Sequence, residues 1–246
     1  MRKIVIAKKI IFSLYYNSFS KKLHKISNFE HSIKRNICHF RQIALFITYF
    51  KHSNTIKNMK RIAIFASGSG SNAENIIKHF ENNKEVCFPF ILVNKQDAYV
   101  HERAKKLGIP SQTFSKQELE DGTILKLLKD NNIDFIILAG FLLKIPEAMV
   151  DAYPRRIVNI HPALLPKYGG KGMYGHHVHE AVVAAKETES GITIHYVDSH
   201  YDHGNTICQA HCAVAPTDTP DDVAANVHKL EYIYFPLAIE QAIADL

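Results

Sequence analysis

RIAIFASGSGSNAENIIKHF, residues 61–80, carries three successive signals that decide the fold. Its first part, RIAIFA (61–66), is a short apolar run that predicts a buried strand. SGSGSN (67–72) follows as a glycine-rich turn, and AENIIKHF (73–80) has apolar residues at helical spacing. A strand, a glycine-rich turn and a helix in this order aim backbone N–H groups and a helix N-terminus at an anion. The stretch therefore predicts an α/β protein with an anion site after its first strand.

The glycine-rich turn leaves three readings of its ligand open. Two of its glycines, Gly68 and Gly70, allow close approach of the backbone, and its polar residues add side-chain donors and a helix cap: Ser69, Ser71 and Asn72. The pattern also fits a loose dinucleotide fingerprint, but the next strand (86–95) ends in Asn94-Lys95 without the acidic residue that would hold a ribose. A monophosphate site is therefore favoured over NAD, and a turn that binds nothing is the third reading.

Strands and helices alternate along the next stretch of chain. Residues 86–95 are predicted as one strand, 97–108 as a helix ended by Gly108, and 109–114 as a short strand. A capping box at Ser115 and Glu118 predicts a helix to about residue 131, and 134–141 is an apolar strand. Repeated strand–helix units predict a single α/β domain with a doubly wound, mostly parallel sheet. Ligands of such sheets bind at the carboxyl ends of the strands.

IVNIHPALLP (157–166) brings polar side chains to that edge of the sheet. Asn159 and His161 are two apart on a predicted strand, so both point to one face, and Pro162 ends the strand. An amide that stabilises an oxyanion beside an imidazole that moves a proton suits acyl transfer. A capped strand end with a structural histidine is the alternative reading of N-x-H alone.

The last third of the chain adds further candidates. A glycine-rich loop (167–175) predicts a mobile cover, and three histidines open the next helix at 176, 177 and 179, without the further ligands that a metal site needs. Asp202 lies in a turn between predicted strands at 190–198 and 206–215. Thr219, Pro220 and two acids predict the start of the last helix, which carries His228 and Glu231 on one face.

Charge divides the chain of 246 residues unevenly. Residues 1–58 hold 12 Lys or Arg and one acid, whereas the remaining 188 hold 18 basic and 23 acidic residues. A mildly acidic body argues against nucleic acid as a partner. The first 58 residues fit a transit peptide, a basic arm, or upstream sequence before a start at Met59. We expect a disordered extension or a mis-assigned start there.

Hydropathy and cysteine spacing bear on the location of the protein. No apolar run of membrane-spanning length is present, so no membrane partner is expected. The four cysteines show no C-x-x-C spacing, and Cys208 and Cys212 are predicted to be reduced, buried thiols of a cytoplasmic protein.

Several motifs then occur together in a familiar order: GSGSN, AGFLLKIP, NIHPALLPKYGGKGMYG, GITIHYVDSHYDHG and HKLEYIYFP. Residues 60 to about 242 closely resemble the folate-dependent phosphoribosylglycinamide formyltransferase family of purine biosynthesis. N-I-H with the later D-x-G is shared by formyltransferases that use formyltetrahydrofolate, and GSGSN with the closing Glu-Tyr helix is typical of this branch. The resemblance implies a Rossmann-like formyltransferase fold with residues 59–246 as the catalytic domain.

The same resemblance implies a reaction and its residues. An amine of glycinamide ribonucleotide would attack the formyl carbon of 10-formyltetrahydrofolate, with no metal. The implied catalytic residues are Asn159, His161 and Asp202, and the implied ribonucleotide site is Gly70, Ser71, Asn72, His228 and Glu231. The implied folate site is Lys116, Leu142, Leu143, Lys144, Ile145, Asn159, Asp198, Ser199, His200, Tyr201 and Asp202. Leu143 stands where many relatives have Arg, and His228 where others have Gln.

Three other functions compete with this one. Formyltetrahydrofolate deformylase hydrolyses the same folate but normally has a folded N-terminal regulatory domain. Methionyl-tRNA formyltransferase has an additional C-terminal domain and needs a surface that suits tRNA. A non-catalytic nucleotide-binding module would have no reason to place Asn159, His161 and Asp202 together. We expect small-molecule substrates and a monomer or homodimer.

Overall fold

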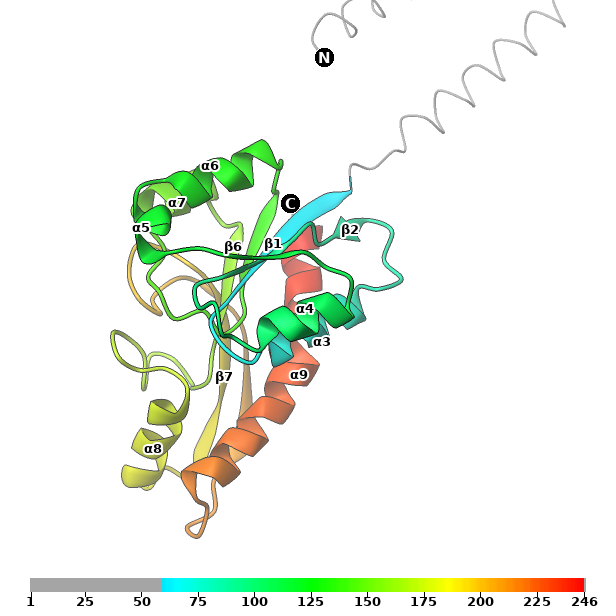
Figure 1. The fold of residues 1–246 in the computed structure, drawn as a ribbon. Helices are drawn as coiled ribbons and strands as arrows, with labels where there is room; N and C mark the ends of the chain where they lie inside the picture. Colours follow the sequence, from blue (N-terminus) through cyan, green and yellow to red (C-terminus); the bar gives the residue numbers. More distant parts are fainter. Residues whose placement is uncertain (1–58, 246) are drawn as a thin grey trace, which may run out of the picture. The chain divides into compact units, whose positions relative to one another are not determined.

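The computed structural model describes residues 59–245, which form one compact unit. The expectations for residues 1–58 lie outside the described residues. Eight strands form one sheet in the order β4-β3-β1-β5-β6-β7-β8, with β2 pairing β1 beside β3 (Figure 1). The strands are β1 (Lys60–Ala66), β2 (Val86–Cys87), β3 (Ile91–Val93), β4 (Ser111–Thr113), β5 (Phe135–Leu138), β6 (Ile157–His161), β7 (Glu189–Tyr196) and β8 (Thr206–Ala213).

The sheet is parallel from β4 to β6 and antiparallel from β6 to β8. The helices of the described part are α3 (Ser71–His79), α4 (Val100–Lys106), α5 (Lys116–Glu120), α6 (Thr123–Asp130), α7 (Glu147–Ala152), α8 (His176–Ala184) and α9 (Pro220–Ala244). This arrangement confirms the predicted doubly wound, mostly parallel α/β fold.

Two apolar layers sandwich the sheet because side chains alternate along β1. Ile62 and Ile64 face the layer built with α3, α4, α8 and α9, whereas Ala63 and Phe65 face the layer built with α5, α6 and α7. All four side chains are fully buried. Both layers therefore rest on β1, and the loop that follows β1 has a rigid base (Figure 1).

Local capping signals placed the starts of two helices correctly. The capping box at Ser115 is present, with Ser115 Oγ accepting from Glu118 N at 3.2 Å. Thr219 caps α9 in the same way through Asp222, and Pro220 is the first helical residue. Gly108 ends the α4 segment with a φ of +68°.

Three expectations about elements were wrong. The predicted strand 86–95 is two strands, because Pro89 lies between β2 and β3 and has no N–H for a ladder. The predicted helix 115–131 is two helices, because Gly122 adopts a φ of +88° between α5 and α6. Cys208 and Cys212 are only half-buried, since β8 is the last strand of the sheet.

Candidate active site

The carboxyl end of β6 carries the two polar residues of the N-x-H pattern. Ile157, Val158 and Ile160 are buried in the sheet, which holds the strand between β5 and β7. His161 is itself only 3% exposed. The antiparallel register pairs Asn159 with His195 on β7, so two polar residues face each other where β6 approaches its end.

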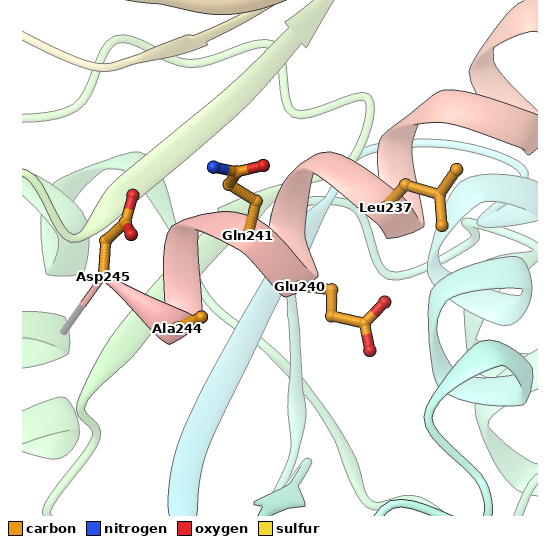
Figure 2. Close-up of a pocket in the computed structure, with 5 residues that line it drawn as sticks. All are labelled: Leu237, Glu240, Gln241, Ala244 and Asp245. Carbon is orange, nitrogen blue, oxygen red and sulfur yellow. The ribbon is translucent and has the colours of Figure 1, made fainter.

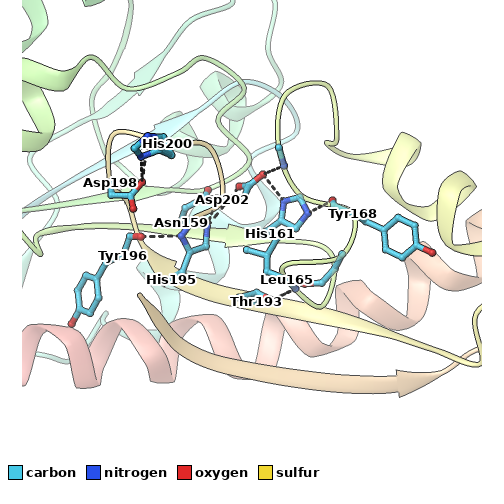
Figure 3. A network of polar contacts seen from close by, with 12 residues as sticks. Asn159, His161, Leu165, Tyr168, Thr193, His195, Tyr196, Asp198, His200 and Asp202 are labelled. Carbon is cyan, nitrogen blue, oxygen red and sulfur yellow. Dashed lines mark hydrogen bonds and ion pairs between the residues drawn. The ribbon is translucent and has the colours of Figure 1, made fainter. Parts of the chain in front are cut away.

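Both ring nitrogens of His161 face oxygen atoms (Figure 3). Nε2 donates to the backbone carbonyl of Tyr168 at 2.7 Å, and Nδ1 lies 3.6 Å from Oδ2 of Asp202. The first contact is a hydrogen bond, whereas the second is longer than one. Nδ1 is therefore the ring nitrogen with the looser protein contact.

Asp202 is held in place by the glycine-rich loop. Its Oδ2 accepts from the backbone N–H of Gly170 at 2.9 Å, and its side chain is 11% exposed. Its φ of +53° is unusual for a residue other than glycine. The structure thus brings together Asn159, His161 and Asp202, which are distant along the chain.

His195 joins this group, and sequence reasoning missed it. Its Nδ1 donates to the carbonyl of Tyr196 at 2.9 Å, which leaves Nε2 to accept from Asn159 Nδ2 at 3.1 Å. Burial lowers the pKa of His195, which keeps the ring neutral and favours this arrangement. Oδ1 of Asp202 lies 3.7 Å from the same Nε2. The signal was available only as strand register, because His195 lies opposite Asn159 across β6 and β7.

The glycine-rich turn after β1 leads directly into α3. Gly70 is the N-cap residue, with a φ of +75° and no side chain, so the cap expected at this position does not come from the N-cap residue itself. A Cβ at Gly70 would lie 2.4 Å from Cγ2 of Val100, which explains why a glycine occupies the cap. The N–H of Ser71, the first residue of α3, donates to Ser69 Oγ at 3.4 Å, a long contact that leaves the helix N-terminus only weakly capped by the turn.

Arg103 on α4 braces this turn from outside. Its Nε donates to the carbonyl of Ser69 at 2.9 Å, and its guanidinium pairs with Glu74 on α3. Hydrogen bonds from Lys78 and Arg103 hold the pKa of Glu74 below its usual value. The turn is therefore tied to two helices through charged groups.

Three of the predicted ribonucleotide residues meet where α3 and α9 pack together. Asn72 Nδ2 donates to Glu231 Oε2 at 2.9 Å, and His228 Nδ1 lies 3.0 Å from the same oxygen. Among the described residues, Asn72 Oδ1 is buried without a hydrogen-bond partner.

His179 on α8 is 6% exposed, and its Nδ1 is buried without a hydrogen-bond partner among the described residues. Burial lowers the pKa of His179, the charge of Glu231 opposes that effect, and His161 also acts on it.

The two predicted folate stretches also approach each other. Leu142 is 40% exposed, and its N–H donates to Ser67 Oγ at 3.0 Å, which ties the stretch to the end of β1. Lys144 Nζ lies 5.9 Å from the ring centre of Tyr201, a cation–π distance that links residues 142–145 with 198–202. In the second stretch, Asp198 Oδ1 accepts from the N–H of His200 at 2.7 Å.

Lys116 has a different environment from the other predicted residues. It opens α5, its side chain is 71% exposed, and its Nζ lies 3.4 Å from Glu120 on the same helix. Its contact with folate stays a prediction.

A shallow pocket of about 320 Å³ lies at the far end of α9 (Figure 2). It is lined by Leu237, Glu240, Gln241, Ala244 and Asp245, none of which is a predicted site residue. Over residues 59–245, no three His, Cys, Asp or Glu side chains converge as a metal site would require. No helix in that range is long and apolar enough to cross a membrane.

The formyl transferase family profile matches residues 60–239. This chain belongs to the formyl transferase family. Within that family, phosphoribosylglycinamide formyltransferase of Bacillus subtilis is 35% identical over 189 residues, which are 74% of this chain and 94% of that protein. The predicted resemblance to the phosphoribosylglycinamide formyltransferase branch is thereby confirmed.

Other family members support the same branch. The chloroplastic phosphoribosylglycinamide formyltransferase of Arabidopsis thaliana is 41% identical over 184 residues, covering 70% of this chain and 62% of that protein. The chain thus spans about three fifths of the length of this chloroplastic relative and of the one from Vigna unguiculata, where the share is 60%. The crystal structure of the Streptococcus pneumoniae TIGR4 phosphoribosylglycinamide formyltransferase has a TM-score of 0.67 and 37% identity, covering 75% of this chain and 99% of that one.

Proposed function

We propose that this chain transfers the formyl group of 10-formyltetrahydrofolate to the amine of glycinamide ribonucleotide, with residues 59–246 as the catalytic domain. The observation that carries the proposal is the meeting of Asn159, His161 and Asp202 at one sheet edge. Each of the three supplies a group that formyl transfer needs: an amide donor, an imidazole and a carboxylate.

The hydrogen bonds of the site suggest a separate role for each of Asn159, His161 and Asp202. One N–H of the Asn159 amide donates to His195, so the second is free to donate to an oxyanion. Nε2 of His161 is engaged by the Tyr168 carbonyl, which makes Nδ1 the nitrogen that exchanges a proton with the reacting groups. Asp202 faces that nitrogen and stabilises the ring when both nitrogens are protonated.

The proposed chemistry runs through a tetrahedral intermediate. The amine attacks the formyl carbon, and Asn159 together with protonated His161 donates to the oxygen that becomes negative. His161 then gives a proton to the folate nitrogen as the carbon–nitrogen bond to folate breaks, and the attacking amine, which became an ammonium, gives up a proton that restores His161. The formyl donor is already activated, so the proposal requires no metal.

The ribonucleotide would lie across the N-terminus of α3 and the middle of α9. Backbone N–H groups at Gly70 and Asn72 can donate to a phosphate, that of Ser71 can do so by exchanging its long contact with Ser69 Oγ, and the helix N-terminus favours negative charge. Glu231 would accept from ribose hydroxyl or amine groups, and His228 stands beside it. Arg103 keeps the turn in the shape that this binding needs.

The pterin of the folate would lie between residues 142–145 and 198–202. Leu142 offers an exposed apolar side chain, while Ile145 is 3% exposed and fixes the stretch in the core. Backbone donors and acceptors of both stretches would then hydrogen-bond to the pterin edge. Because Leu143 replaces an arginine, recognition here would rest mainly on backbone groups.

We further propose a cytoplasmic location, which the free thiols Cys87, Cys208 and Cys212 support. The plant relatives are named as chloroplastic, so fractionation of the source cells is the direct check.

Formyl transfer to glycinamide ribonucleotide tests the proposed activity directly. Purified protein is mixed with 10-formyltetrahydrofolate, with and without the ribonucleotide, and release of tetrahydrofolate is followed by absorbance. We expect release only when the amine is present, whereas equal release without it would identify a deformylase. His161→Ala should abolish the transfer while the protein keeps the circular dichroism spectrum of its folded state, and retained turnover would remove this histidine from the mechanism.

A further inference from the structure

The carbonyl that contacts His161 belongs to a residue that is anchored through its own side chain. Figure 3 shows the Tyr168 ring turned away from His161 while its backbone carbonyl faces Nε2. On the far side, the Tyr168 hydroxyl donates to Glu187 Oε1 at 2.9 Å. Lys167 Nζ donates to the two oxygens of the same carboxylate at 2.9 and 3.2 Å.

Glu187 is in turn fixed to the end of α8. Its N–H donates to the carbonyl of Val182 at 3.2 Å, and the preceding residue, Lys186, has a φ of +54°. The carboxylate therefore projects from a defined turn between α8 and β7 rather than from a free loop end.

The loop between β6 and Tyr168 is fastened only in its first half by β7. Thr193 Oγ1 donates to the Ala163 carbonyl at 2.7 Å and accepts from the Leu165 N–H at 2.9 Å. Beyond Leu165 the chain reaches Tyr168, which has a φ of +56°. The Tyr168 ring packs against the apolar layer that contains α8 and α9, and Glu187 fixes its hydroxyl by a hydrogen bond.

We propose that Glu187 is a positioning residue for formyl transfer, which acts on His161 through the hydroxyl and the carbonyl of Tyr168. The contact keeps the carbonyl 2.7 Å from Nε2, and the carbonyl accepts only, so Nε2 must carry a hydrogen. The Glu187 carboxylate thus sets the orientation of the His161 ring and leaves Nδ1 to exchange the proton, although Glu187 itself does not touch the substrate. This inference rests on the proposed function.

The surroundings argue against a purely structural role for Glu187. A pocket of about 230 Å³ lies beside it, lined by Ala163, Leu164, Pro166, Lys167, Tyr168, Val182, Glu187, Glu189, Ser190 and His211. The Glu187 side chain is 23% exposed and that of Lys167 is 65% exposed, so little apolar packing depends on either. Hydrogen bonds from Lys167 and Tyr168 hold the pKa of Glu187 low, and burial with the Glu187 contact raises the pKa of Tyr168. The three groups are thus held together by polar contacts.

Glu189 provides a matched control two residues along the chain. Its carboxylate lines the same pocket and lies 3.2 Å from His211 Nδ1. The structure shows no hydrogen bond from Glu189 to residues 162–168, its charge acts on Lys167 only from a distance, and its side chain is 58% exposed. Glu187→Ala and Tyr168→Phe break the contact, Glu187→Gln keeps an acceptor for the tyrosine, and Glu189→Gln leaves the contact intact.

Steady-state kinetics separates positioning from binding. We expect Glu187→Ala and Tyr168→Phe to lower kcat roughly tenfold, since small displacements of a catalytic group cost up to about a hundredfold. The KM values for both substrates should stay within about twofold, because the contact reaches neither proposed substrate site. Glu187→Gln and Glu189→Gln should stay near the wild-type kcat. An unchanged kcat in Glu187→Ala and Tyr168→Phe, or a rise in KM alone, overturns the proposal.

A second measurement is independent of turnover. Long-range ¹H–¹⁵N spectra of the histidine rings, assigned with His161→Gln, report whether Nε2 of His161 carries a hydrogen in the full-length protein. We expect the His161 signals to move in Glu187→Ala and to stay in Glu189→Gln. If the wild type transfers no formyl group, the proposed function fails while this test still stands. Unmoved His161 signals in Glu187→Ala overturn the positioning role itself.

Discussion

Gly70→Ala tests the reasoning about the turn that leads into α3. The substitution adds one methyl group where φ is +75°, and that carbon would lie 2.4 Å from Cγ2 and 2.9 Å from Cα of Val100. The left-handed conformation costs an alanine about 1–2 kcal/mol. Overpacking against the start of α4 costs about another 1–3 kcal/mol. We therefore expect the free energy of unfolding to fall by about 2–5 kcal/mol.

Two other glycines separate these contributions. Gly122 has a φ of +88° and open space around its added carbon, so Gly122→Ala carries the conformational cost alone, about 1–2 kcal/mol. Gly68 has open space and no positive φ, so Gly68→Ala should be neutral or stabilise slightly, by up to about 1 kcal/mol. Each Gly→Ala substitution also lowers the conformational entropy of the unfolded chain, which stabilises the folded protein. This gain is similar in all three variants, so it cancels when their free energies of unfolding are compared.

Urea unfolding followed by circular dichroism measures the three variants under one condition. Gly70→Ala should lower the urea midpoint most, Gly122→Ala less, and Gly68→Ala not at all. Gly70→Ala should also raise the KM for glycinamide ribonucleotide, because relief of the clash moves the turn that we propose binds its phosphate. A midpoint for Gly70→Ala that equals that of Gly122→Ala would refute the argument from the Val100 contact.

Three further outcomes are expected. Asp202→Asn should lower kcat about a hundredfold with an unchanged unfolding midpoint, because it removes the charge that faces two histidine rings; wild-type turnover would separate Asp202 from the chemistry. Glu231→Gln should raise the KM for glycinamide ribonucleotide about tenfold, through loss of a charge-assisted hydrogen-bond acceptor beside Asn72; isothermal titration with the ribonucleotide checks this, and unchanged affinity contradicts it. Burial lowers the pKa of both His179 and His195 from 6.5, so the unfolded chain binds protons that the folded chain does not, and stability should fall as pH drops below about 6.5. Urea midpoints at pH 7.5 and 5.5 test this effect, with a smaller difference expected in His179→Gln.

Short-range patterns account for what could be predicted of the fold. The strand, turn and helix at 60–79 and the capping boxes at Ser115 and Thr219 depend on residues a few positions apart. The errors arose where one residue overrode a longer pattern, as Pro89 and Gly122 did. Apolar periodicity spans many residues, so it gives little sign of a helix or strand boundary that a single proline or glycine sets.

In the candidate site, too, the residues that could be predicted depend on short-range spacing, and the missed residue depends on tertiary contacts. The spacing of Asn159 and His161 placed both on one face of a strand, and the motif resemblance supplied Asp202. His195 was missed because its contact with Asn159 spans 36 positions and depends on the register of β6 and β7. Alternation along a strand says which face a side chain takes but not which residue lies opposite.

By itself, the sequence determined the α/β layering, the glycine-rich turn after β1 and the polar end of β6, since these follow from periodicity, glycine content and helix capping over short spans. Tertiary structure alone decided that Asp202 stands between two histidines and that a tyrosine carbonyl, anchored by Glu187, occupies one nitrogen of His161. The physical reason is that hydrogen bonds between distant segments require each backbone to be fixed first. That fixing comes from the packed core and from strand register, which no local stretch of sequence contains.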